Sequence, residues 1–229
     1  MCKSAAPVKN AVQENFKLVI QSKNLIIHTK QLTSTALTAH IKLLQFRFMT
    51  LHKSRIQIKH LTIPANQTFI NFYNVFTGAL PDLVIVGLVS DAVLASGYHG
   101  NPFNLNNFGM NLIEIKRNGT SVLRGGYTRN FANGKYLKAY TTFLQELECD
   151  IGDRRISLIS SEWANGYTLY AFKFNDGPIG SGTSGPRSNS ITGSARLEMS
   201  FAAPVNENIK VIVYHQKPGR IQFTALLVL

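Results

Sequence analysis

Cysteine, charge and long apolar runs are all scarce in this 229-residue chain. Two cysteines, Cys2 and Cys149, are too few for a disulfide scaffold or a cysteine-based zinc site. The longest apolar run, residues 83–89, is far shorter than the roughly 20 residues that a membrane helix needs, and no apolar segment follows the basic start. With 45% hydrophobic and 16% charged residues, the composition predicts a globular, intracellular chain with a sizeable core and neither a membrane span nor a secretory signal.

Acidic residues and glycine are missing from the first part of the chain. Residues 1–62 contain ten Lys/Arg and one acid, a balance of +9, whereas residues 63–229 contain fourteen Lys/Arg and eleven acids, a balance of +3. All 17 glycines lie between Gly78 and Gly219. We therefore expect a boundary near residues 62–78, with a segment 1–62 that is too short to bury a core alone and a segment 63–229 that forms a domain.

The first segment contains short apolar runs that are typical of strands and of one helix. Leu37, Ile41 and Leu44 recur at helical spacing, whereas the other runs are rich in β-branched side chains. The predicted elements are strands at 16–20 and 25–29, a helix capped by Thr33 or Ser34, and a strand at 55–63 with a bulge near Lys59.

Beyond Pro64, short apolar runs alternate with loops rich in Gly, Asn and Pro. The predicted strands are 68–72, 83–90, 111–116, 167–174, 191–201, 208–215 and 221–228, with helical segments at about 135–147 and 161–164. The Asn118-Gly119 pair fits a tight hairpin, and the low-complexity stretch 177–186 fits a surface loop. Many short strands with few helices predict an all-β, antiparallel sandwich, of which the jelly roll is one form.

No combination of residues in the sequence predicts catalysis. Cys149 stands among acids, which disfavour a reactive thiolate, and Glu162 beside Trp163 lacks a second carboxylate in a fixed relation to it. The glycine-rich stretch 177–186 lacks the Gly-Lys-Ser/Thr ending of a phosphate-binding loop. Four histidines in the first segment have neither paired spacing nor acids around them: His28, His40, His52 and His60. We therefore expect no enzyme and no catalytic, cofactor-binding or metal-binding residues.

Several short strings are recognisable together once the strands are placed. The strongest are Asn101-Pro102-Phe103-Asn104 and Gly166-Tyr167-Thr168-Leu169-Tyr170-Ala171-Phe172. The others lie at 14–17, 37–40, 55–59, 62–65, 78–81, 196–198 and 211–214. In order and spacing, from about residue 14 to 217, these strings resemble the major capsid proteins of Maverick/Polinton elements and the related adintoviruses.

The resemblance implies a double jelly-roll capsid protein, in which three chains form a capsomer and capsomers tile an icosahedral shell. It implies that residues 1–62 correspond to the closing strands and helix of a first jelly roll, and that residues 63–229 correspond to the second. It also implies a homotrimer with neighbouring capsid proteins as partners, located in the virion capsid if functional and otherwise in the cytoplasm or nucleus.

The chain departs from the family pattern at both ends. It begins far inside the family's length, and its end, residues 217–229, is apolar where a strand of mixed charge is expected. Both departures suggest a truncated genomic copy, whose strands have lost partners and are prone to self-association.

Two further hypotheses come from other classes of protein. The +9 balance of residues 1–62 favours a nucleic-acid-binding module that would rest on residues such as Lys53, Arg55 and Lys59, although aromatic side chains for base stacking are few there. A jelly roll that binds a ligand or glycan is the other, and only Trp163 and scattered tyrosines offer stacking surfaces for it.

Overall fold

The computed structural model describes seven parts of the chain and divides it into two compact units. The described parts are residues 20–46, 49–94, 100–128, 131, 134–149, 156–174 and 191–223. One unit is Lys53–Gly219, and the other combines Met1–His52 with Arg220–Leu229. The expected loop at 177–186 and the last residues of the expected strand at 221–228 lie outside the described residues.

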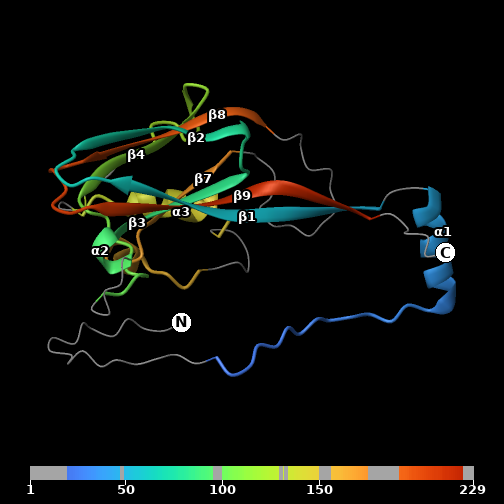
Figure 1. Ribbon diagram of the computed structural model, residues 1–229. Helices are drawn as coiled ribbons and strands as arrows, with labels where there is room; N and C mark the ends of the chain where they lie inside the picture. The colour runs from blue at the N-terminus through green and yellow to red at the C-terminus, as the bar shows by residue number, and fades with distance from the viewer. Residues whose placement is uncertain are drawn as a thin grey trace. The chain divides into compact units, whose positions relative to one another are not determined.

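Lys53–Gly219 is built from two antiparallel sheets, which confirms the all-β sandwich predicted from the sequence (Figure 1). One sheet has the order β1-β9-β3-β7; the other has the order β2-β8-β4-β5, with β6 also paired to β4. The strands are β1 (Met49–Ile63), β2 (Phe69–Ala79), β3 (Leu83–Ser90), β4 (Met110–Arg117), β5 (Thr120–Ser121), β6 (Tyr127–Thr128), β7 (Leu169–Lys173), β8 (Thr192–Phe201) and β9 (Ile209–Phe223).

The strands pair in a nested order. The first strand pairs with the last, β2 with β8, β3 with β7, and β4 with the short strands β5 and β6 that follow it. The nested pairs are joined side by side, because β9 also pairs with β3 and β8 with β4. As a result β1 and β2 each lie at one edge of their sheet, with β7 and β5 at the opposite edges.

The core is formed by the apolar side chains that point inward at every second position of the strands. Val84 stands opposite His215 and Phe172, and Val86 opposite Val213 and Tyr170; all six side chains are fully buried between the sheets. Because side chains alternate between the two faces of a strand, the same pattern continues through the apolar residues of β4 and β8. Both faces of β3 are largely buried, which explains why its sequence is a nearly continuous apolar run.

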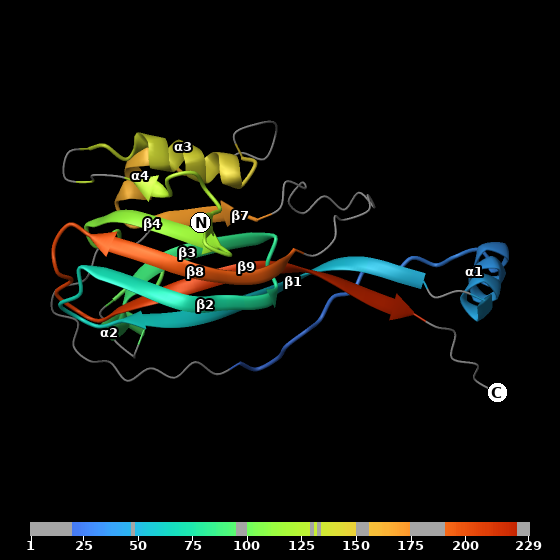
Figure 2. The same cartoon turned by 90° about the horizontal axis from the view of Figure 1, so that it is seen from above.

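Two helices cover the side of the sandwich formed by β7 (Figure 2). They are α3 (Leu137–Glu146) and α4 (Ser160–Ala164), close to both helical segments predicted from the sequence; a third short helix, α2 (Asp91–Leu94), follows β3. Trp163 of α4 is fully buried, and its indole N–H donates to the Leu169 carbonyl at 3.0 Å. Its ring lies 5.8 Å from Tyr170 and 6.3 Å from Phe143, so this tryptophan joins the helices to the core.

The predicted tight hairpin is present between β4 and β5. Asn118 and Gly119 have φ angles of 47° and 87°, the left-handed backbone that a two-residue antiparallel turn requires. The Asn118 side chain also accepts a hydrogen bond from the Ser194 N–H at 2.9 Å, which ties the turn to β8.

The first part of the chain differs from expectation. Helix α1 (Ser34–Phe46) begins where it was predicted, but residues 20–29 form no strand, and residues 16–19 lie outside the described part. The side chains of Leu25 and Ile26 are 86% and 83% exposed. The prediction of strands was wrong for residues 20 and 25–29, because none of the described strands supplies backbone hydrogen bonds to them.

The boundary expected at residue 62 falls within strand β1. Because β1 pairs with β9, its residues from Lys53 onward belong to the sandwich unit and not to the segment before it. The assignment of residues 1–62 to the end of a first jelly roll stays a prediction.

A hydrogen bond across the sandwich gives a test of this packing. The buried hydroxyl of Tyr127, on one sheet, donates to the Ala171 carbonyl, on the other, at 2.6 Å. Replacing Tyr127 by Phe removes the donor and is expected to lower the free energy of unfolding by about 1–2 kcal/mol. Urea unfolding followed by Trp163 fluorescence measures the change. Tyr73→Phe, at a side chain that is 70% exposed, is the control and should leave stability unchanged.

Candidate functional site

The inner face of the sandwich changes from apolar to charged along β1 and β9. On β9, Val211 and Val213 are fully buried, and the next residues on the same face are His215 and Lys217. On β1, the buried Ile63 and the core residue Leu61 are followed on the same face by Lys59, Gln57 and Arg55. The charged ends of the two strands meet, because the Gln57 amide oxygen lies 3.3 Å from His215 Nε2.

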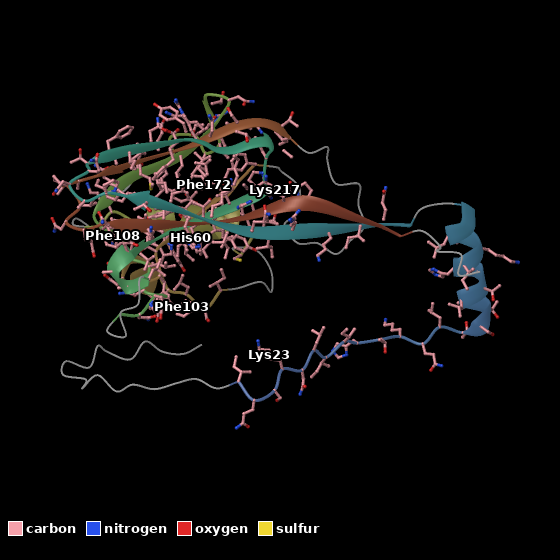
Figure 3. The ribbon with its side chains drawn as sticks, viewed as in Figure 1. Lys23, His60, Phe103, Phe108, Phe172 and Lys217 are labelled. Carbon is pink, nitrogen blue, oxygen red and sulfur yellow. The ribbon has the colours of Figure 1, made fainter. Side chains whose placement is uncertain are left out.

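Two lysines lie beside one buried ring, and the charge of Arg55 acts on one of them, Lys217; we call Arg55, Lys59 and Lys217 the cationic cluster. The ammonium groups of Lys59 and Lys217 lie 4.9 Å and 5.9 Å from the centre of the Phe76 ring. Lys59 also donates a hydrogen bond to the Val75 carbonyl at 2.7 Å, which fixes its position. Figure 3 labels Lys217 on the sandwich, together with Phe172 between the sheets. Ring-face contacts stabilise these cations only in part, since a ring carries no net charge.

No acidic side chain among the described residues forms an ion pair with the cationic cluster. Other partly buried lysines of the sandwich are paired: Lys116 lies 2.7 Å from Glu198, and Lys173 lies 2.5 Å from Glu148. Burial lowers the pKa of Lys217 from its ordinary value, and the charges of Lys59 and Arg55 lower it further. Within the described part of the chain, the positive charge of the cluster is therefore not paired with an acidic side chain.

His215 lies beside the cationic cluster and is fully buried. Its ring packs edge-on against Phe76 at 4.8 Å between centroids, and its Nδ1 atom has no hydrogen-bond partner. Burial lowers the pKa of His215, and the charges of Lys217 and Lys59 act in the same direction. The ring is therefore neutral near pH 7, with Nε2 placed to donate to Gln57.

A second candidate feature is exposed apolar surface on the edge strands and on one turn. Ile56 and Ile58, alternate residues of β1, are each 57% exposed, and Phe69 and Tyr73 of β2 are 53% and 70% exposed. Phe103 is 77% exposed in a turn that is fixed by hydrogen bonds from the backbone N–H groups of residues 103 and 104 to Asn101 (Figure 3). Rigid, exposed apolar side chains of this kind are typical of surfaces that contact other proteins.

The residues weighed in the sequence for catalysis are not brought together. Glu162 is exposed, and its carboxylate caps α4 by accepting from the Ile159 N–H at 3.4 Å. Trp163 is fully buried and so offers no surface for sugar stacking, which removes the main residue of the glycan-binding hypothesis. Cys149 is half-buried, and Cys2 and the side chain of His52 lie outside the described residues. His28, His40 and His60 are exposed.

Within the described residues, no group of three or more potential ligands could hold a metal ion, and no helix is long and apolar enough to cross a membrane. Comparison with known proteins gives no relative: no protein-family model and no curated protein matches the chain.

Sequence reasoning singled out Arg55 and Lys59 only as part of a basic segment and missed His215 and Lys217. The signal that could have found them is alternation: in residues 209–217, every second residue is apolar until His215 and Lys217 take the same face. What the sequence could not show is that this face meets the charged face of β1, where Gln57 lies 158 residues before His215.

The buried histidine predicts a pH dependence of stability. Because the pKa of His215 is lower in the folded chain, the unfolded chain binds more protons once the pH falls below about 6.5, so stability declines with falling pH in that range. His215→Gln should reduce this decline between pH 7.5 and pH 5. Urea midpoints at the two pH values measure it. His60→Gln, at an exposed histidine of β1, should leave the decline as in the unmodified chain.

Proposed function

We propose that this chain is a structural subunit of a capsid shell, a fragment of a double jelly-roll major capsid protein of the Maverick/Polinton kind that forms trimers. The nested strand pairing supports the jelly-roll assignment. Counting β5 and β6 as one strand, eight strands pair first with last, second with seventh, third with sixth and fourth with fifth, as they do when a long hairpin is wrapped into two four-stranded sheets. The strings that resemble the capsid family support it independently.

The observation that carries the proposal is the exposed apolar surface of residues 20–43. Eight large apolar side chains in this segment are between 47% and 86% exposed: Ile20, Leu25, Ile26, Ile27, Leu32, Leu37, Ile41 and Leu43. An isolated soluble chain rarely keeps so many together in water. They are expected to be buried against a neighbouring jelly roll or a neighbouring subunit.

The edge strands supply the second part of the argument. β1 and β2 each have one neighbour in their sheets, and both carry exposed apolar side chains. Edge strands of monomeric proteins are usually protected by charges, prolines or a covering loop. In a shell subunit such edges are instead covered by adjacent subunits, and no catalytic group is required.

The nucleic-acid-binding hypothesis has less support. Lys59 lies on the inner face of β1, and its ammonium group is bonded to the Val75 carbonyl. Phe76, the ring beside it, is only 1% exposed, so no base can stack on it.

The solution mass of the full chain tests the proposal. Light scattering at low and high salt, without nucleic acid, should show a discrete trimer that persists at high salt, because apolar contacts are not screened. A chain that stays monomeric at high concentration, with sharp and reversible unfolding, would contradict it.

A paired substitution tests whether the edge strand takes part. Ile56→Thr with Ile58→Thr keeps β-branched residues in β1 and removes exposed apolar surface. Association should weaken by about tenfold or more, roughly 1.4 kcal/mol, with little change in thermal stability. His60→Thr, at an exposed residue on the same face of β1, is the matched control and should leave association unchanged. Equal association of the paired variant and the control would exclude β1 from the interface.

A further inference from the structure

We propose that the cationic cluster binds a small multivalent oxyanion of the phosphate class beside Phe76, at the charged inner ends of strands β1 and β9. Arg55, Lys59 and Lys217 supply its charges, and the buried His215 ring packs against Phe76 next to them. The inference does not depend on the proposed role in a shell.

The first argument is charge. Three cations lie near one another without an acidic partner in the described part of the chain, whereas Lys116, Lys173 and Lys210 of the same sandwich each have one. Lys217 is half-buried, whereas Arg55 and Lys59 are exposed, and charges near a half-buried group repel it more strongly than in bulk water. A bound anion relieves that repulsion, and an anion with two or more charges relieves it more than chloride does.

The second argument is preorganisation. Lys59 is held by the Val75 carbonyl and has two further N–H donors, and Arg55 can present a planar set of donors to an oxyanion. The His215 ring is fixed between Phe76 and Gln57 and so holds the base of the cluster in place. These groups need little ordering when an anion arrives, which favours affinity.

The surroundings favour a small oxyanion over a nucleic-acid strand. Phe76 and His215 are 1% and 0% exposed, so neither ring is available to stack on a base. Binding of single-stranded nucleic acid usually combines charge with such stacking. The residues of the cluster are therefore suited to a phosphate group that is bound through its charge alone. That phosphate group is either free or at the end of a polynucleotide.

Thermal unfolding in phosphate tests the site, with the single tryptophan, Trp163, as a buried probe. Titration of inorganic phosphate at constant ionic strength, balanced with sodium chloride, should give a saturable stabilisation of the unmodified chain. At ten times the dissociation constant, the folding equilibrium should shift by about tenfold. Lys217→Gln, and separately Arg55→Gln, should lose the saturable part, and Lys217→Gln should be as stable as the unmodified chain or more stable in chloride alone, because a repulsive charge is gone.

Lys210→Gln is the matched control, since Lys210 lies on the opposite face of β9 and pairs with Asp91. This variant should keep the full response to phosphate. An identical response in the unmodified chain and in Lys217→Gln would overturn the proposal, because it would show a general salt effect. No saturable response at all would overturn it as well.

A further arm of the experiment identifies the source of the phosphate. A short single-stranded oligonucleotide is added at the phosphate concentration that gives half of the full response. Stabilisation by inorganic phosphate alone supports a free oxyanion. Greater stabilisation by the oligonucleotide that is lost in Lys217→Gln supports the same site and assigns it to nucleic-acid phosphate.

Discussion

The structure depends on one constraint, that every strand must find hydrogen-bond partners for its backbone. The sandwich meets this constraint by nesting, because the first strand pairs with the last and each inner pair lies within the one before it. β3 and β8 therefore have neighbours on both sides, and their inner residues form the core. Residues 20–29 have strand-forming side chains but no partner among the described strands, and they form no strand and are exposed. The need for backbone hydrogen-bond partners therefore explains the sandwich, and it is the reason why we expect residues 20–29 to pair with a neighbouring chain.

Side chains alternate between the two faces of each strand, and this alternation determines which residues form the core and which form the proposed binding surfaces. The inner faces of β1 and β9 are apolar where the two sheets enclose them and become charged toward the ends that carry Arg55 and Lys217. The apolar part supplies the core, and Tyr127 and Trp163 tie the sheets and covering helices to it. In the charged part, burial and the charges of Lys59 and Arg55 lower the pKa of Lys217, and we propose that this part binds an ion of opposite charge. An outer face with Ile56 and Ile58 is suited to contact protein.

The fold could be predicted from local patterns, whereas the candidate site could not. Residues 83–90 and the Asn118-Gly119 turn have signals that depend only on near neighbours, and both predictions were confirmed. The strands predicted at 16–20 and 25–29 are absent in the residues that the structure describes, because β propensity does not provide a partner strand. The approach of Lys59 to Lys217 depends on the pairing of β1 with β9, which no short pattern encodes. Trp163 had been expected as an exposed platform in one hypothesis, but the covering helix α3 buries it.

Amide hydrogen exchange across a range of protein concentrations tests the central claim, that neighbouring chains complete what this chain leaves unpaired. The account predicts that amides of residues 20–29 exchange fast at low concentration and become protected as the chain associates. Amides of β3, which are already paired on both sides, should be protected throughout. Fast exchange of residues 20–29 in the associated state, with β3 protected, would contradict the account, because the apolar segment would then have no structural partner in the assembly.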